Sequence, residues 1–120
     1  MVNFLGQKGE DLAEKYFKNR GCEILTKNFH SRFGEIDLII KDRDQIVFVE
    51  VKTRKSNSFG TPEESISRLK LQKIIKTALY FLNSSRKNCY TGWRIDSIGI
   101  LLSAENKLLK FKHLKNITNG

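Results

Sequence analysis

Two neighbouring stretches decide the fold: GEIDLII at Gly34–Ile40 and IVFVEVKTR at Ile46–Arg54. Each alternates apolar residues with other residues at period two, which is typical of strands that pair with each other. Only the polar segment Lys41–Gln45 separates them, so the sequence predicts a β-hairpin. The simplest hairpin has Arg43 and Asp44 as a two-residue loop. Arg-Asp is a weak turn signal, and a longer loop or a bulge is the alternative.

The two-residue loop determines which residues face each other. On one face all the pairs are apolar: Ile40 with Val47, Leu38 with Val49, and Ile36 with Val51. A slip of one residue would bring charged side chains onto this face, which favours this register. On the other face the pairs are Ile39 with Phe48, Asp37 with Glu50, and Glu35 with Lys52.

The pairing of Asp37 with Glu50 would place two carboxylates opposite each other. Opposed Cβ atoms lie about 4.5–5.5 Å apart, and like charges at that distance destabilise a sheet. Either one carboxylate is protonated or a cation lies between the two. Mg²⁺ takes oxygen ligands at roughly 2.0–2.1 Å, so two facing carboxylates can share one ion. Lys52 follows Glu50 on the same face, about 6.6 Å along the strand, and can reach over such a site.

The composition indicates a basic globular protein. The chain has 120 residues, enough for a single domain with one core (1–120). It carries 22 Lys and Arg against 13 Asp and Glu, a formal net charge of +9. This excess points to nucleic acid first and an anionic membrane second; a basic surface without a specific partner is the alternative.

Targeting signals and cysteine usage bear on location. No stretch reads as a signal peptide or a transmembrane segment, so no membrane association is expected. Cys22 and Cys89 form no metal-spaced cluster. We therefore expect reduced thiols in a cytoplasmic protein.

The rest of the chain supplies helices and further strands. Helices are expected from about Gly6 to Arg20 and from Thr61 to about Leu82, and further strands at Cys22–Phe29, Trp93–Leu102 and Lys107–Leu114. The second helix would begin with a capping box made by Thr61, Pro62 and Glu64. The tail 115–120 is expected to be loose. This order predicts an α/β fold with a mixed sheet of about five strands and helices packed against it.

Several residues outside the hairpin are candidates for the site. Glu10 lies at the edge of the apolar stripe of the first helix, where it either leans over the sheet or favours the helix dipole. His30 precedes the hairpin and is a ligand, a base or neither. The loop Lys55–Gly60 is a flap over substrate or a plain connector. Arg94 and Asp96 share a strand face, where they either form a structural ion pair, which we favour, or border the site.

The second helix has an apolar side and a basic side. Its apolar side is expected to hold Leu71, Ile74, Ile75, Ala78, Leu79, Phe81 and Leu82. Lys70, Lys73 and Lys76 follow each other at three-residue spacing on the other side. They are either phosphate contacts or a solvated face, and the net charge of +9 favours contact with phosphates.

An acid on one strand followed by acid-x-Lys on the next, here Asp37 and then Glu50-Val51-Lys52, resembles the signature of the PD-(D/E)XK nuclease superfamily. The Pro-Asp dipeptide of that signature is absent, since Ile36 precedes Asp37. The longer pattern resembles the bacterial YraN family, which is similar to archaeal Holliday junction resolvases. The likeness extends to Gly9-Glu10, Lys70, Lys73 and Arg94-Ile95-Asp96.

The resemblance implies a restriction-endonuclease-like fold and an endonuclease that uses Mg²⁺ or Mn²⁺ to hydrolyse phosphodiester bonds, above all in branched DNA. It implies Asp37, Glu50 and Glu10 as metal ligands, and Lys52 as the residue that orients water or stabilises charge. Arg54, Lys55 and the three lysines of the second helix would contact the nucleic-acid backbone. The resolvase likeness also implies a C2 homodimer.

Two other readings remain open, together with the role of Glu35. The first is a nucleic-acid-binding module of the same fold without turnover. The second is a protein whose basic face meets acidic lipids or a protein partner. Glu35 would either tune Lys52 or form a structural salt bridge with it.

Overall fold

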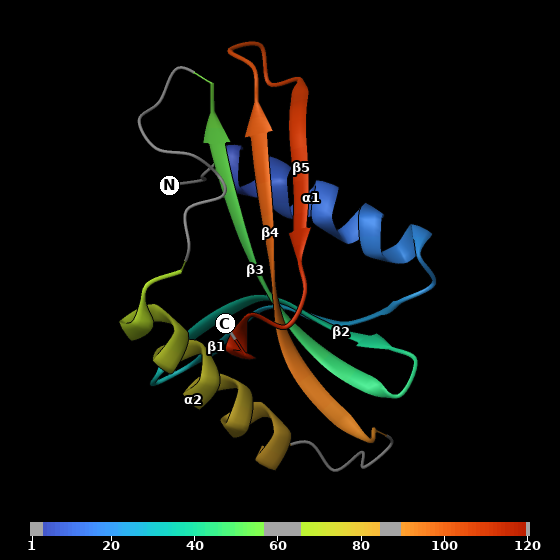
Figure 1. Ribbon diagram of the computed structural model, residues 1–120, viewed down its shortest axis with the longest axis vertical. Helices are drawn as coiled ribbons and strands as arrows, with labels where there is room; N and C mark the ends of the chain where they lie inside the picture. Colours follow the sequence, from blue (N-terminus) through green and yellow to red (C-terminus); the bar gives the residue numbers. More distant parts are fainter. Residues whose placement is uncertain (1–3, 57–65, 85–89, 120) are drawn as a thin grey trace.

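The computed structural model describes residues 4–56, 66–84 and 90–119. The elements follow the predicted order of one helix, three strands, one helix and two strands, ending in a short 3₁₀ turn (Figure 1). They are α1 (Phe4–Asn19), β1 (Glu23–Ser31), β2 (Gly34–Asp42), β3 (Gln45–Lys55), α2 (Arg68–Ser84), β4 (Gly92–Leu102), β5 (Leu108–Leu114) and η1 (Ile117–Asn119).

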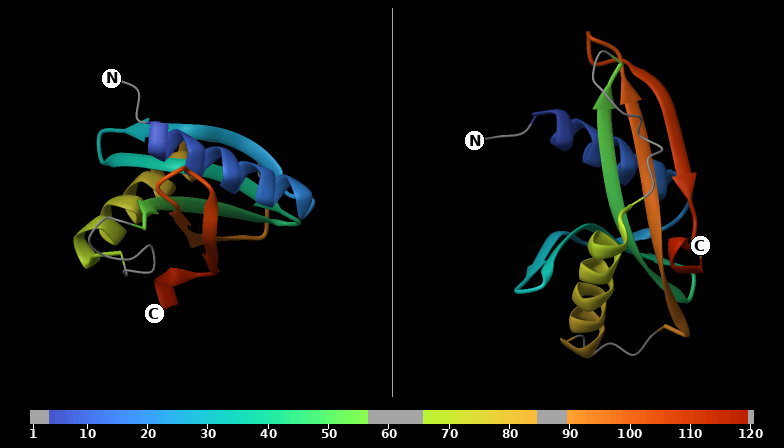
Figure 2. Two further views of the ribbon diagram at one scale, coloured as in Figure 1. Left: turned by 90° about the horizontal axis from the view of Figure 1, so that it is seen from above. Right: turned by 60° about the vertical axis from the view of Figure 1, so that its left-hand side comes forward.

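The five strands form one mixed sheet in the order β1-β2-β3-β4-β5. All neighbouring strands run antiparallel except β3 and β4, which are parallel. A parallel pair needs a crossover connection, and α2 lies on that connection. The two helices lie on opposite faces of the sheet (Figure 2), which confirms the predicted α/β class.

The core consists of two apolar clusters separated by the sheet. On the α1 side, Ala13 and Phe17 pack against strand residues that include Val47 and Val49. On the α2 side, Ile74 and Ala78 pack with a second set: Ile36, Ile39, Ile46, Phe48 and Ile95. Because successive side chains of a strand point to opposite faces, β3 contributes residues to both clusters from its buried stretch 46–49.

The β2–β3 hairpin has the predicted two-residue loop. Asp42 pairs with Gln45, and the ladder continues to Leu38 and Val49. Arg43 takes a left-handed backbone conformation with a φ of 57°, which lets the chain reverse in so short a loop.

Beyond Leu38 the two strands separate, which the sequence did not predict. The pairs of Asp37 with Glu50 and of Glu35 with Lys52 are not part of the described ladder. Instead, the Val51 N–H donates a hydrogen bond to Asp37 Oδ2 at 2.7 Å. β2 stays paired with β1 and curves with it toward the α2 side (Figure 2).

The separation changes the neighbours of Ile36. The expectation that Ile36 shares one apolar face with Leu38 is wrong, since Leu38 packs on the α1 side and Ile36 in the cluster beneath α2. The end of β2 that carries Asp37 therefore diverges from β3 where the predicted pairs would have formed.

The second helix begins later than expected. Ser67 caps α2, because its Oγ accepts a hydrogen bond from the Lys70 N–H at 3.1 Å. The predicted capping box at Thr61, Pro62 and Glu64 lies outside the described residues. Leu79 is 45% exposed and so does not join the apolar side of the helix, whereas Ile74 and Ala78 are buried as predicted.

The C-terminal tail contains a short turn. Residues 117–119 form the turn η1, and Ile117 packs against the α2-side cluster. The Asn116 N–H donates to the buried carboxylate of Asp96 at 3.0 Å. No helix in the described ranges is long and apolar enough to cross a membrane.

Candidate metal centre

Glu50 is a half-buried acid on β3. Its side chain is 14% exposed, and its Oε1 lies 3.4 Å from Lys70 Nζ at the start of α2. Burial, followed by the negative charge of Asp37, raises the pKa of Glu50 from 4.5 to about 7, and Lys70 offsets part of this rise. A carboxyl group with such a pKa readily exchanges its proton for a cation near neutral pH.

Asp37 lies where β2 leaves β3, and its carboxylate occupies the position that a ladder partner of Val51 would otherwise fill. The Val51 N–H holds Oδ2, which leaves Oδ1 available to a ligand. Burial raises the pKa of Asp37 above its usual value; the hydrogen bond from Val51 opposes the rise, and Glu35 adds to it. The negative charge of Asp37 also raises the pKa of Glu50, so the two acids share one poorly solvated region.

Glu10 approaches these acids from α1. Burial and then the charge of Asp37 raise the pKa of Glu10, against a hydrogen bond from Asn28. The preceding residue explains the close approach of the helix. A Cβ atom on Gly9 would collide with Thr53 Oγ1 of β3, so only glycine lets α1 pack this closely at that point. Glu10 thus leans over the sheet, the first of its two predicted positions.

The three acids influence one another, but they do not form a tight cluster. Within residues 4–56, 66–84 and 90–119, no three acidic, His or Cys side chains come close enough to hold one ion together. Glu10 therefore stands next to the pair formed by Asp37 and Glu50 and does not complete a three-ligand set with it.

Lys52 and Glu35 are not partners. Lys52 lies two residues beyond Glu50 on β3, where its backbone position pairs with Gly99 of β4. The expectation that Glu35 faces Lys52 is wrong, because Glu35 Oε2 lies 3.2 Å from His30 Nδ1 on the adjacent strand β1. His30 thus lies beside Glu35 at an exposed position, and in the described part of the chain Lys52 forms no ion pair.

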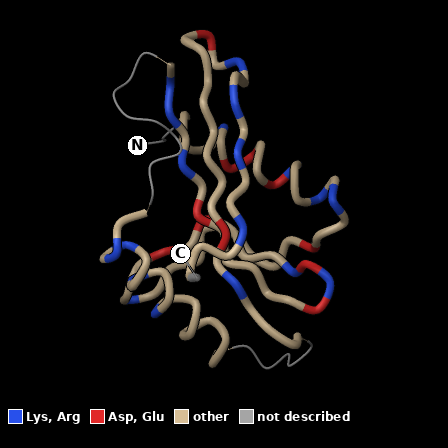
Figure 3. The backbone as a smooth tube through the Cα atoms, viewed as in Figure 1, with Lys and Arg blue, Asp and Glu red and all other residues tan. Residues whose placement is uncertain are grey.

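The basic residues near the acids lie on two elements, the helix α2 and the last part of β3. Lys70 lies against Glu50, whereas Lys73 and Lys76 are exposed on α2. Figure 3 shows Lys and Arg along the last part of β3, where Arg54 and Lys55 are half-buried. Lys55 Nζ also donates to the Ala104 carbonyl at 3.4 Å. Arg54 and Lys55 follow Glu50 along β3, and Lys70 approaches Glu50 from α2.

Comparison with known sequences places the chain in a family. Residues 9–100 match the family described as "Uncharacterised protein family UPF0102". The chain belongs to UPF0102. This is the YraN family that the sequence motifs resemble, so that prediction is confirmed.

Individual UPF0102 proteins match most of the chain. A UPF0102 protein of Syntrophomonas wolfei is 41% identical over 112 residues, which cover 93% of this chain and 95% of that protein. A UPF0102 protein of Clostridium botulinum is 44% identical over 113 residues, covering 93% and 91%. One of Persephonella marina is 53% identical over 77 residues, covering 64% and 66%. The matched UPF0102 region contains Glu10, Asp37, Glu50 and Lys52.

The donor set of this UPF0102 chain fits a magnesium-type ion. Mg²⁺ prefers oxygen ligands and is commonly held by one or two carboxylates together with waters and substrate phosphates. Asp37 and Glu50 supply two such carboxylates, and the raised pKa of each shows that uncompensated negative charge is costly there.

The contact between Lys70 and Glu50 was not predicted from the sequence. The sequence favours a phosphate contact over a solvated face for Lys70, and the structure places its ammonium group 3.4 Å from Glu50 Oε1. No local pattern signals this contact, because it depends on how α2 docks on the sheet.

Proposed function

We propose that this UPF0102 protein is a metal-dependent endonuclease that hydrolyses phosphodiester bonds in nucleic acid, with structured or branched DNA as its substrate. The observation that supports this most is the pair of half-buried acids, Asp37 and Glu50, each with a raised pKa, with Lys52 two residues after Glu50 on β3. Acids facing a polyanion would hinder its binding unless a cation neutralises them.

Each side chain of the proposed site would have a distinct role. Asp37 and Glu50 would hold Mg²⁺ or Mn²⁺, which when bound supplies a Lewis acid beside the scissile phosphate. The Val51 N–H holds Asp37 Oδ2, so Oδ1 would be the oxygen that Asp37 offers to the ion. Glu10 would accept hydrogen bonds from water in the same region. Lys52 would orient the attacking water or stabilise the charge that develops on the phosphoryl oxygens.

The surrounding basic side chains would bind the nucleic-acid backbone. Arg54 and Lys55 at the end of β3 and Lys73 and Lys76 on α2 would contact phosphates without reading sequence. When metal and nucleic acid are bound, Lys70 would leave Glu50 and contact a phosphate oxygen. A C2 homodimer would present two such sites to a branched substrate. The cytoplasmic location expected from the cysteines stays a prediction.

A non-catalytic nucleic-acid-binding module of the same fold is the second candidate, and one observation favours it. The ion pair between Lys70 and Glu50, at 3.4 Å, already neutralises part of the acid pair without any metal. A protein that only binds nucleic acid could tolerate its acids in this way.

Cleavage assays separate the two candidates. Purified protein with Mg²⁺ should cut branched, flapped or linear DNA. Glu50→Ala and Lys52→Ala should each abolish cutting and leave binding largely intact. Glu105→Ala and Lys15→Ala, which make the same charge changes at exposed positions, should cut like the wild type. Cutting that survives both Glu50→Ala and Lys52→Ala would refute the site assignment. Binding without cutting in both Mg²⁺ and Mn²⁺ would support the non-catalytic module.

A further inference from the structure

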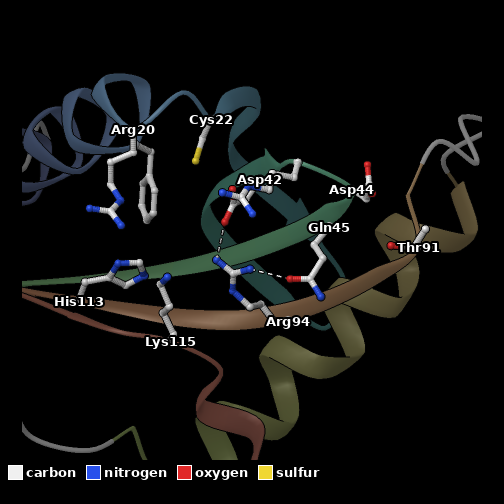
Figure 4. A pocket seen from close by; sticks show the side chains of 11 residues that line it. Arg20, Cys22, Asp42, Asp44, Gln45, Thr91, Arg94, His113 and Lys115 are labelled. Carbon is white, nitrogen blue, oxygen red and sulfur yellow. Dashed lines mark hydrogen bonds and ion pairs between the residues drawn. The ribbon is translucent and has the colours of Figure 1, made fainter.

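A pocket of about 700 Å³ opens at the end of the β2–β3 hairpin that is remote from the acid pair (Figure 4). Its wall includes Phe17 of α1, the hairpin loop and Arg94 of β4. Gln45 also lines it, and Glu50 lies five residues further along β3, which corresponds to about 16 Å. The volume falls in the range of small-ligand sites, about 300–1,000 Å³. The proposed nuclease chemistry does not use this pocket.

The guanidinium group of Arg94 is held in place by three acceptors in the wall of the pocket. Nη1 donates to Gln45 Oε1 at 2.7 Å, Nη2 to Asp42 Oδ2 at 3.1 Å, and Nε to Asp96 Oδ1 at 3.0 Å. A guanidinium carries five N–H donors, so one donor on each Nη remains for a ligand. Arg94 is therefore held in one orientation before a ligand binds. A ligand would lose little free energy in ordering this side chain.

The acids beside Arg94 are already satisfied. Asp96 is fully buried and also binds His113 Nε2 at 2.8 Å and the Asn116 N–H at 3.0 Å. Burial alone would raise the pKa of Asp96, but these hydrogen bonds and Arg94 hold it below its usual value. His113 Nδ1 in turn meets the Tyr16 hydroxyl at 2.8 Å. This network ties α1, β4 and β5 into a rigid wall.

Three further cations stand around the pocket, and they are exposed: Arg20, Arg43 and Lys115. Figure 4 shows Arg20 and Lys115 reaching from opposite sides toward the space beside His113. Arg20 is braced by the Tyr16 ring, with 5.2 Å between its guanidinium carbon and the ring centroid.

The pocket is positive overall. Asp42 and Asp44 are the acids that line it, and Asp42 is paired with Arg94. Burial raises the pKa of the Cys22 thiol, so that this group is neutral at pH 7. The lining has four cations and two acids, and with Asp96 behind Arg94 counted as a third acid one positive charge remains in excess.

We propose that this pocket binds a phosphate group, carried either by a free mononucleotide or by the terminal phosphate of a nucleic-acid strand. A phosphate dianion suits the forked donors of Arg94 and the two exposed cations Arg20 and Lys115. The pocket offers little flat apolar surface for a base, since Phe17 is only 1% exposed, so the phosphate is the group recognised. This inference holds whether or not the acid pair is catalytic.

The test compares two double variants with the same change in charge. Arg20→Gln/Lys115→Gln removes two exposed cations that line the pocket and leaves the Arg94 network intact. Lys15→Gln/Lys107→Gln removes two exposed cations that do not line the pocket. Binding of inorganic phosphate, a 5′-mononucleotide, and a short oligonucleotide with and without a 5′-phosphate is measured by calorimetry in EDTA. Circular dichroism and thermal melting confirm that each variant is folded.

Wild type and the control variant should bind phosphate saturably. Arg20→Gln/Lys115→Gln should bind it at least roughly tenfold more weakly, because charge-assisted hydrogen bonds are lost. Tighter binding of the mononucleotide identifies a free nucleotide as the source. A preference for the 5′-phosphorylated oligonucleotide identifies a strand end. Equal weakening in both double variants, or no saturable binding by wild type, would overturn the proposal. Weakening confined to Arg20→Gln/Lys115→Gln separates this pocket from the acid pair, because neither double variant changes a residue of that pair.

Discussion

The ammonium nitrogen of Lys70 lies 3.4 Å from Glu50 Oε1, although the two residues belong to α2 and β3. Lys70 lowers the pKa of Glu50, against the stronger effects of burial and of Asp37. The lysine thus provides part of the positive charge that the acid pair needs. A divalent ion bound to Glu50 would repel it.

Removing this lysine should strengthen metal binding. At pH 8.5, above the pKa of Glu50, Lys70→Gln should bind Mn²⁺ about fivefold more tightly, equivalent to the ~1 kcal/mol upper range for a partly exposed ion pair. Isothermal calorimetry measures this affinity. Lys76→Gln, an exposed lysine of the same helix, serves as the control and should leave it unchanged. Weaker Mn²⁺ binding by Lys70→Gln would show that Lys70 supports the metal site instead of competing with it.

The pKa of Glu50 predicts how stability depends on pH. The folded protein holds a proton on Glu50 up to about pH 7, whereas the unfolded chain releases it near 4.5. Between these values the folded state binds more protons, so the free energy of unfolding should fall as pH rises. The shift corresponds to roughly 3 kcal/mol. The raised pKa values of Asp37 and Glu10 act in the same direction.

Urea denaturation at pH 5 and pH 8 measures this effect in metal-free buffer. Glu50→Gln should be more stable than the wild type at pH 8 and should show a weaker pH dependence. Added Mg²⁺ should stabilise the wild type at pH 8 more than at pH 5, because protons no longer compete. A wild type that is equally stable at both pH values would rule out the strongly raised pKa.

The contact between Gly9 and Thr53 positions Glu10 and can be tested by its sterics. Gly9→Ala would push a methyl group into Thr53 Oγ1. We expect a loss of about 1–3 kcal/mol, as for other overpacked cores, despite the better helix propensity of alanine. Adding Thr53→Ala should restore part of the lost stability, since Oγ1 and Cγ2 are removed while Cβ stays 3.0 Å from the new methyl. Gly21→Ala, at a position with open space but a φ of 83°, separates steric collision from backbone strain. No recovery in the double variant would contradict the collision.

Asp96 should be the acid whose loss costs most stability. It is fully buried and accepts hydrogen bonds from Arg94, His113 and the Asn116 N–H. Asp96→Ala would leave Arg94 without a buried partner, and removal of one member of a buried pair costs about 3–5 kcal/mol. Chemical denaturation measures the loss, and Asp44→Ala in the exposed hairpin loop should change stability little. Similar small effects for both would mean that the network is not structural.

The parts of the fold that were predictable depend on local patterns. The hairpin register from Asp42–Gln45 to Leu38–Val49 follows from period-two alternation and a two-residue loop. The ion pair between Arg94 and Asp96 was also expected, because residues two apart share a strand face.

The unpredicted parts depend on tertiary packing. Ile36 is apolar in either position, and the docking of α2 decides which cluster it joins. The same docking brings Lys70 to Glu50, and the departure of β2 from β3 leaves Glu35 with His30 instead of Lys52. The helix cap at Ser67 was missed because Thr61 and Pro62 carry the same local signal earlier in the chain.

A crystal structure of the protein grown at pH 8 and soaked in Mn²⁺ would test most directly whether the acid pair holds a metal. We predict a Mn²⁺ ion, located by its anomalous-scattering peak, bonded to carboxylate oxygens of both Asp37 and Glu50. Lys70 Nζ should have moved away from Glu50. Asp37→Asn crystals treated in the same way should show no such peak. A wild-type structure without an ion at this pair, in which Lys70 keeps its contact with Glu50, would contradict the proposed metal centre.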